Sequence, residues 1–185
     1  MSFFPMCVEL KDKWILLVGT GAQTAEKLDK LRPFGAVLTR VDTLRAEDLQ
    51  PRPVFVVVGD HSEAEARRCS MLCGEQGIPV NVVDRPELCS FFFPALISRG
   101  ELTVSVSTGG KSPGAAAWLR GRIEQALPDK MEEILEWLSD IRRQLKSEYP
   151  AAVYGPILKQ MTERAFAEQR PLTQEECARL LGELK

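Results

Sequence analysis

An apolar run that ends in a glycine turn is the feature that most restricts the fold of this chain. Trp14–Val18 (WILLV) is continuously apolar, as expected for a parallel strand that is buried on both faces. It leads directly into Gly19-Thr20-Gly21, and the apolar residues of Thr24–Leu31 then follow at helical spacing. A buried strand that enters a helix through a tight glycine turn predicts the first βα unit of an open parallel sheet.

The following segments continue this alternation of strands and helices. Three further strands are predicted, at Ala36–Val41, Val54–Val58 and Ile78–Val83. Ser62–Gln76 predicts a helix that ends at Gly77. Strands and helices at this spacing predict βαβ units, and therefore a Rossmann-like α/β fold.

The pattern changes after residue 90. Phe91–Ile97 is a dense apolar run, and Glu101–Ser107 alternates as a half-buried strand does. From Ser112 onward only helices are predicted, with Ser112 as an N-cap and Pro113 in the first turn. The predicted helices are Ala115–Leu127, Lys130–Ser147, Ile157–Gln169 and a last one from Thr173, with breaks at Pro150 and Gly155-Pro156.

The composition excludes several classes of protein. The chain has 185 residues, 44% of them hydrophobic, which suits one large domain or one domain with a smaller second one. A net charge of −2 argues against general nucleic-acid binding, and no apolar run approaches the roughly 20 residues that span a bilayer. The first ten residues lack the basic segment of a signal peptide.

The cysteines favour a cytoplasmic protein with reduced thiols. Their number is odd and their spacing scattered, at positions Cys7, Cys69, Cys73, Cys89 and Cys177. Cys69 and Cys73 share one face of a predicted helix, so they suit either two metal ligands or a small buried pair. We favour the buried pair, because free cysteines are usually buried.

The glycine turn matches the spacing of a dinucleotide-binding fingerprint, Gly19-x-Gly21-x-x-Thr24. Its third position is normally Gly or Ala, so Thr24 departs from the fingerprint, and a tight βα turn without a ligand is the alternative. Asp42, at the end of the second strand, stands where an acid would bind the ribose of NAD. Arg40 would instead favour the 2′-phosphate of NADP, and we expect NAD rather than NADP.

Two more polar turns follow predicted strands. Gly59-Asp60-His61 follows the third strand and Asp84 the fourth. Ligands of open α/β sheets collect at these carboxyl ends. Asp84 is therefore a candidate general base or metal-associated carboxylate. From spacing alone, a turn or capping aspartate is slightly favoured.

Several of these motifs together resemble the precorrin-2 dehydrogenase / sirohydrochlorin ferrochelatase family, the N-terminal module of siroheme synthases that also occurs as a stand-alone enzyme. The resemblance covers residues 3 to about 128. It rests on the opening ELKDKWILLVGTGAQTAEKL, on Asn81-Val82-Val83-Asp84, on Ser90-Phe91 and Pro94, and on Val106-Ser107-Thr108-Gly109-Gly110-Lys111-Ser112-Pro113.

The resemblance implies oxidation of precorrin-2 to sirohydrochlorin with NAD, and in some relatives insertion of Fe²⁺ into sirohydrochlorin. It implies a catalytic Asp84. The implied cofactor-binding residues are Gly19, Gly21, Ala22, Gln23, Thr43 and Leu44, beside Asp42. The implied substrate-binding residues are Thr108, Gly109, Gly110 and Lys111, with Arg85, Arg99 and Arg120 as further cations for the substrate carboxylates. His61 is the one histidine, so a multi-histidine iron site is excluded and no resident metal is expected.

The resemblance also implies a homodimer formed by segments after the α/β domain. We thus expect a Rossmann-like parallel sheet followed by a dimerisation segment and an all-helical C-terminal region. The expected domains are 1–112, NAD-binding, of which 89–112 leads into the dimerisation segment, and 113–185, helical. A chain of 185 residues has no room for the methyltransferase module of siroheme synthases, so we expect another protein to supply precorrin-2.

Two turns depart from the family pattern, and both lie on the nucleotide side. Val41-Asp42-Thr43-Leu44 replaces a Val-x-Ala-Pro-like segment, and Val58-Gly59-Asp60-His61 replaces an Ala-Thr-Asp-Asp turn. A non-catalytic module that binds a nucleotide or tetrapyrrole as sensor or carrier is therefore the alternative function. Asp84 and the Gly109-Gly110 turn favour the enzyme.

Overall fold

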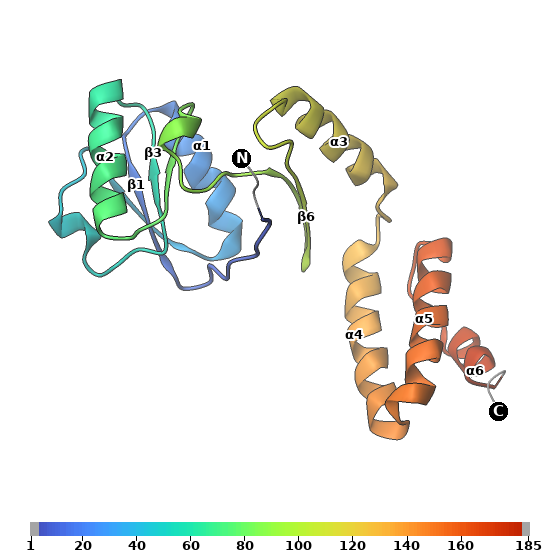
Figure 1. Ribbon diagram of the computed structural model, residues 1–185. Coiled ribbons are helices and arrows are strands. Elements are labelled where there is room, and N and C mark those ends of the chain that lie inside the picture. Colours follow the sequence, from blue (N-terminus) through green and yellow to red (C-terminus); the bar gives the residue numbers. More distant parts are fainter. Residues whose placement is uncertain (1–3, 183–185) are drawn as a thin grey trace. The chain divides into compact units, whose positions relative to one another are not determined.

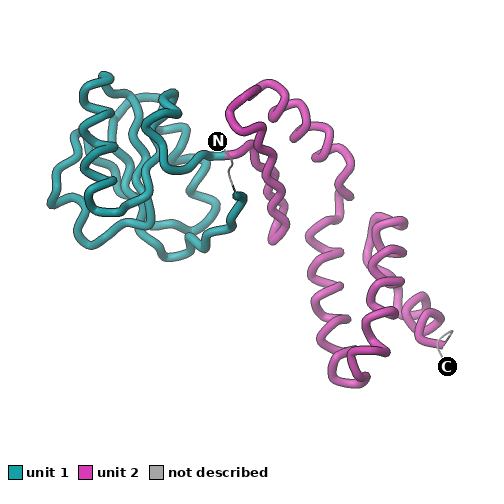
Figure 2. Tube along the Cα trace, viewed as in Figure 1, with its two compact units in different colours: residues 1–93 teal, residues 94–185 magenta. Residues whose placement is uncertain are grey.

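A computed structural model describes residues 4–182 of the chain and divides it into two units, 1–93 and 94–185 (Figure 2). The ends of the two expected domains, residues 1–3 and 183–185, lie outside the described residues. The division falls earlier in the chain than the expected domain boundary at 112/113. The reason is that the strands after residue 94 pair with each other and not with the parallel sheet.

The first unit, in which Figure 1 labels β1 and β3, contains a four-stranded parallel sheet. The strand order is β2-β1-β3-β4. Its strands are β1 (Trp14–Val18), β2 (Val37–Val41), β3 (Val56–Val58) and β4 (Val80–Val82). Val18 pairs with both Val41 and Val58, and Val58 pairs with Val82. The four strands therefore end in one row, which places the turns that follow them along a single edge.

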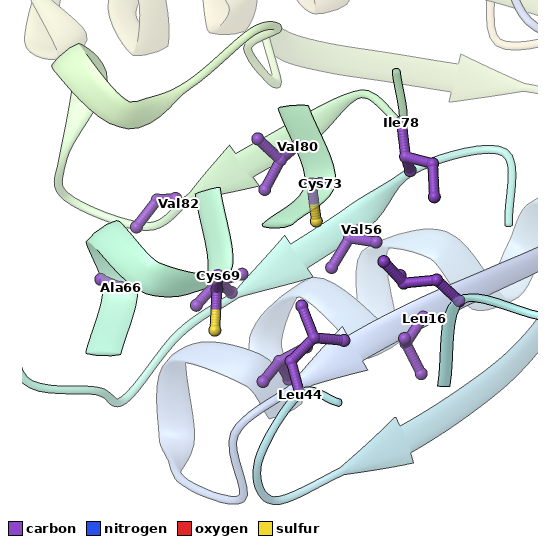
Figure 3. Packing of buried hydrophobic residues seen from close by; sticks show 12 residues of the cluster. Leu16, Leu44, Val56, Ala66, Cys69, Cys73, Ile78, Val80 and Val82 are labelled. Carbon is purple, nitrogen blue, oxygen red and sulfur yellow. The ribbon is translucent and has the colours of Figure 1, made fainter. Parts of the chain in front are cut away.

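Helices cover both faces of this sheet, because successive side chains of a strand point to opposite faces. Ile15, Leu17 and Val57 pack with Leu28 and Leu31 of α1 (Ala22–Leu31). The opposite face packs against α2 (Glu63–Glu75), and Figure 3 shows strand residues such as Val56 together with Cys69 and Cys73 of this helix. Short 3-10 turns lie at Arg32–Phe34, Glu47–Leu49 and Pro86–Leu88. The predicted Rossmann-like α/β fold is confirmed.

Cys69 and Cys73 of α2 are completely buried in this second face (Figure 3). Burial raises the pKa of the Cys69 thiol to about 11 and that of Cys73 to about 12, so both stay protonated at neutral pH. Within residues 4–182 no three potential metal-ligating side chains of the His, Cys, Asp or Glu type come together. The two cysteines are core residues, as the favoured interpretation expected.

The second unit begins with an antiparallel hairpin of β5 (Ala95–Arg99) and β6 (Leu102–Val106). The helix α3 (Pro113–Ala126) follows. The hydroxyl of Ser112 accepts a hydrogen bond from the N–H of Ala115, which confirms Ser112 as the N-cap.

Three more helices complete this unit, namely α4 (Met131–Glu148), α5 (Ala151–Glu168) and α6 (Gln174–Gly182). They share an apolar core that includes Ile134, Ile157 and Met161. Thr173 and Glu176 form the reciprocal hydrogen bonds of a capping box at the start of α6. No helix in the described part of the chain is both long and apolar enough to cross a bilayer.

One predicted break is wrong. Gly155-Pro156 lies inside α5, which begins at Ala151 and not at Ile157. Proline interrupts the hydrogen bonds of a helix, but it is tolerated best near the N-terminus, where fewer of these bonds exist. Pro156 lies in the second turn of α5 and removes one helical hydrogen bond, but the burial of Ile157, Met161 and Ala165 in the helical core outweighs this local cost.

Candidate functional site

Two aspartates at the ends of neighbouring strands have left-handed backbone conformations. Asp60 follows β3 with a φ of 61°, and Asp84 follows β4 with a φ of 59°. Asp adopts this conformation more readily than most residues, and such geometry clusters at functional sites. Both carboxylates lie at the sheet edge where the fold brings the strand ends together.

The Asp60 carboxylate caps the N-terminus of α1. It accepts hydrogen bonds from the N–H of Gln23 at 3.2 Å, the N–H of Thr24 at 3.0 Å and the Thr24 hydroxyl at 2.6 Å. The hydroxyl bond and then the backbone bonds lower the pKa of the Asp60 carboxyl, against the opposing effect of desolvation. The N-terminal end of the helix dipole also favours this negative charge.

The glycines of the fingerprint are explained by packing within the protein. A Cβ at Gly19 would overlap the carbonyl oxygen of Gly59, and a Cβ at Gly21 would overlap the Asp60 carboxylate. Thr24 is fully buried at the third fingerprint position, where its hydroxyl binds Asp60. The departure from Gly or Ala at this position therefore has a function inside the fold.

Gln23 connects this cap to Asp84. Its side-chain oxygen accepts a hydrogen bond from the N–H of Asp60 at 2.9 Å, and its Nε2 donates to Asp84 Oδ2 at 2.7 Å. The backbone donor therefore fixes which end of the amide faces Asp84. Among the described residues nothing donates a hydrogen bond to Asp84 Oδ1.

These side chains line an open pocket of about 460 Å³ at the strand ends. Arg85 contributes a cation next to Asp84, and its Nη2 donates to the carbonyl oxygen of His61 at 3.1 Å. The full lining consists of Gln23, Asp60, His61, Val83, Asp84 and Arg85. The pocket thus combines two carboxylates, a guanidinium and an imidazole, a set suited to moving protons and binding acidic groups.

A second pocket, of about 390 Å³, lies at the end of β2 and is lined by Val41, Asp42, Thr43, Arg45 and Asp48. Two of the expected cofactor-binding residues, Asp42 and Thr43, are exposed there. The next residue of this turn, Leu44, was also expected to bind the cofactor, but its side chain is fully buried in the core. A ligand at this turn would therefore reach only the backbone of Leu44.

Arg40 supports the glycine turn. Its Nε donates to the carbonyl oxygen of Gly19 at 2.7 Å and its Nη2 to that of Gly21 at 3.1 Å. Two of its donors are thus already used within the protein. This weakens the argument for a 2′-phosphate ligand at Arg40.

The strand ends suit the adenosine part of a dinucleotide better than its pyrophosphate. The pocket beside Asp42 is suited to an adenosine, because an acid at this point of the fold binds ribose hydroxyls. The N-terminus of α1, which usually faces the pyrophosphate, has its Gln23 and Thr24 N–H groups bound to Asp60. Asp42, Thr43 and the turn residue Ala22 would hold a nucleotide, with Asp60 next to its phosphates.

The expected substrate-binding residues lie in the second unit, in the turn between β6 and α3. The Thr108 hydroxyl accepts a hydrogen bond from the N–H of Ser112 at 3.2 Å and donates to its carbonyl oxygen at 3.1 Å. Gly109, Gly110 and Lys111 are exposed. The turn is thus closed at its base and open to solvent at its tip.

Sequence reasoning missed the role of Asp60 and of Thr24. The signal was present, because Asp60 directly follows an apolar strand and Thr24 stands where a small residue was expected. Helix caps are usually sought in the residues next to the helix, whereas Asp60 reaches α1 from another strand.

Two family models match separate parts of the chain. The family described as "Putative NAD(P)-binding" matches residues 42–95, which include β3, α2 and β4. "Sirohaem biosynthesis protein central" matches residues 99–126, which include β6, the Thr108–Lys111 turn and α3.

The curated relatives include siroheme synthases of several bacteria. That of Thioalkalivibrio sulfidiphilus is 37% identical over 170 residues, which cover 81% of this chain and 35% of the relative. That of Azotobacter vinelandii is 34% identical, over 81% of this chain and 37% of the relative. The chain therefore spans little more than a third of the length of the curated relatives it matches.

A solved structure described as "SirC, precorrin-2 dehydrogenase" has the same fold. It superimposes with a TM-score of 0.70 over 98% of both chains, at 17% sequence identity. This similarity extends the fold assignment from the parallel sheet to the helical second unit.

Proposed function

The chain belongs to the family of sirohaem-biosynthesis proteins that includes the matched region of siroheme synthases, and from this premise we propose that it oxidises precorrin-2 to sirohydrochlorin with NAD. The observation that carries the proposal is the hydrogen bond between Gln23 and Asp84. It joins the glycine turn on the nucleotide side to the carboxylate proposed for catalysis.

The oxidation removes a hydride and a proton from precorrin-2. NAD, held by Asp42, Thr43 and Ala22, would supply the acceptor of the hydride. We assign the proton to Asp84, whose Oδ2 is held by Gln23 and whose Oδ1 faces no donor among the described residues. Gln23 and the left-handed backbone of Asp84 fix the direction of this carboxylate before the substrate binds.

The substrate carries carboxylates, and cations near the site suit their binding. Arg85 lines the same pocket as Asp84. Thr108, Gly109, Gly110 and Lys111 are proposed as a second group of contacts, supported by the family match over residues 99–126.

The test is the formation of NADH after precorrin-2 and NAD⁺ are added to the purified chain. Asp84→Asn is the matched variant, because Asn tolerates the positive φ of this position better than Ala. We expect the wild type to turn over and the variant to lose at least about 100-fold in kcat. Equal rates in both proteins would exclude Asp84 as the base, and no turnover in either would favour the sensor or carrier alternative.

Insertion of Fe²⁺ into sirohydrochlorin is a second candidate activity. It is supported by the two carboxylates, Asp60 and Asp84, that line one pocket and can bind a divalent metal ion in transit. The test is the rate of Fe²⁺ or Co²⁺ insertion above the uncatalysed rate. No acceleration would leave the chain a dehydrogenase only.

We also propose a cytoplasmic homodimer. Trp118 and Leu119 of α3 are 65% and 41% exposed, which is unusual for large apolar side chains. Sedimentation of the purified chain would distinguish the dimer from a monomer.

A further inference from the structure

We propose that Asp60 determines how this chain discriminates among nucleotides, because its carboxylate occupies the place of a phosphate at the N-terminus of α1. The inference rests on the nucleotide binding proposed above. Its consequence is that the pyrophosphate adds little to the affinity of the wild-type chain, and that removal of the Asp60 charge restores that contribution.

The hydrogen-bond donors at the N-terminus of α1 are already used within the protein. A helix N-terminus binds phosphates through N–H groups that have no partner within the helix. In α1 the N–H groups of Gln23 and Thr24 both donate to the Asp60 carboxylate, as does the Thr24 hydroxyl. A phosphate would have to displace these bonds or do without them.

The space beside the glycine turn is also occupied by the protein. In dinucleotide-binding turns the second glycine lets the backbone approach the pyrophosphate. Here the volume next to the Gly21 Cα holds the Asp60 carboxylate, which a Cβ at this position would overlap. The absence of a side chain at Gly21 therefore makes room for the Asp60 carboxylate and not for a bound phosphate.

Asp60 is held in place by its own backbone hydrogen bond. Its N–H donates to Gln23 Oε1 at 2.9 Å, and the amide of the same residue binds Asp84. The guanidinium of Arg40, which contacts this turn, donates to the carbonyl oxygens of Gly19 and Gly21. Two negative groups, the carboxylate and a pyrophosphate, would thus share one helix end.

The experiment compares the binding of adenosine, ADP and NAD⁺ to the wild type and to Asp60→Asn by titration calorimetry. Asn keeps the size of the side chain, tolerates the positive φ and removes the charge. We expect Asp60→Asn to bind ADP and NAD⁺ about fivefold or more tightly than the wild type does, because a helix end attracts an anion. Adenosine affinity should stay the same.

Asp12→Asn is the matched control, because Asp12 also has a positive φ, of 59°, but precedes β1 at the opposite end of the strand. It should bind all three compounds as the wild type does. Asp60→Ser repeats the test with a smaller neutral cap if Asp60→Asn does not fold.

The outcomes separate the inference from the proposed function. If ADP and NAD⁺ bind both proteins with equal affinity, or if adenosine gains as much as NAD⁺, the inference is overturned while the cofactor assignment stands. If neither protein binds NAD⁺ or adenosine, the proposed cofactor fails, and the inference fails with it.

Discussion

Two glycine turns of the chain, Gly19–Gly21 and Gly109-Gly110, each lie between a strand and a helix, and their environments are opposite. Around the Gly19–Gly21 turn, Gly59, Thr24 and Asp60 fill the space that a side chain would need. Around Gly109 and Gly110, no heavy atom of the described chain beyond the adjacent residues lies within 4 Å of where a Cβ would be. The first turn is a packed junction between strands and helix, and the second is an exposed tip.

The difference shows that glycines in similar sequence contexts have different physical causes. In the first turn glycine is required because other groups approach the backbone closely. In the second it is favoured because the φ angles of 63° and 81° suit a residue without a Cβ. Substitutions in the two turns should therefore differ in their effects on stability and on ligand binding.

Gly19→Ala should have the largest effect. Its φ of 116° and the overlap of a Cβ with the Gly59 carbonyl oxygen leave no room for the substitution without backbone movement. We expect a loss of more than about 4 kcal/mol in the free energy of unfolding, measured by urea denaturation. A loss below about 1 kcal/mol would show that the two turns do not differ in packing.

Gln23→Glu tests whether the packed turn also serves the chemistry. The new carboxylate would face Asp84 Oδ2 in place of the amide donor, while an oxygen stays opposite the N–H of Asp60. We expect kcat to fall about tenfold or more with little change in KM for precorrin-2.

Gln76→Glu, at the C-terminal end of α2, is the control for the added charge and should leave kcat unchanged. A wild-type kcat for Gln23→Glu would show that Gln23 does not position Asp84. If the melting temperature of Gln23→Glu falls together with kcat, Gln23 contributes to stability and not to the positioning of Asp84.

Gly109→Ala should cost less than Gly19→Ala. Only the positive φ opposes the substitution, so we expect a loss of about 1–2 kcal/mol in stability, measured by the same denaturation. A loss as large as that of Gly19→Ala would indicate that the tip is packed in solution, for example against a second copy of the chain.

Asp60→Asn should give the smallest effect, and one that depends on pH. The lowered pKa of Asp60 means that its charged form stabilises the fold above the usual value of 3.8 and that this stabilisation is lost as pH falls below it. We expect the variant to melt about 2–5 °C below the wild type at pH 7. The difference should close in acid, whereas that of Gly109→Ala should not, as melting curves across pH would show.

The sheet was predictable because its apolar strands and glycine turn are local signals. Trp14–Val18 was predicted with its exact bounds, and the Ser112 cap was recognised from its position before Pro113. The start of α5 was not predicted correctly, because the cost of Pro156 is local whereas the burial of Ile157 and Met161 depends on other helices. Tertiary packing decided this element.

The site was predictable only in part for the same reason. The row of strand ends followed from the expected parallel sheet, so Asp42 and Asp84 were placed at one edge. The cap of α1 by Asp60 joins the β1–α1 unit to the turn after β3, and the bond from Gln23 to Asp84 joins the same α1 to the turn after β4. No local pattern encodes such partners. The roles of the site residues stay predictions until the variants are measured.

The burial of Cys69 and Cys73 has a consequence for experiments on the protein. Both thiols lie between α2 and the sheet with no exposed surface, so a thiol-specific reagent reaches them only when this layer separates. Their rate of modification in native buffer therefore reports how often the first unit opens, without any introduced label. The exposed Cys7 would react first, and its rate would serve as the reference for a fully accessible thiol.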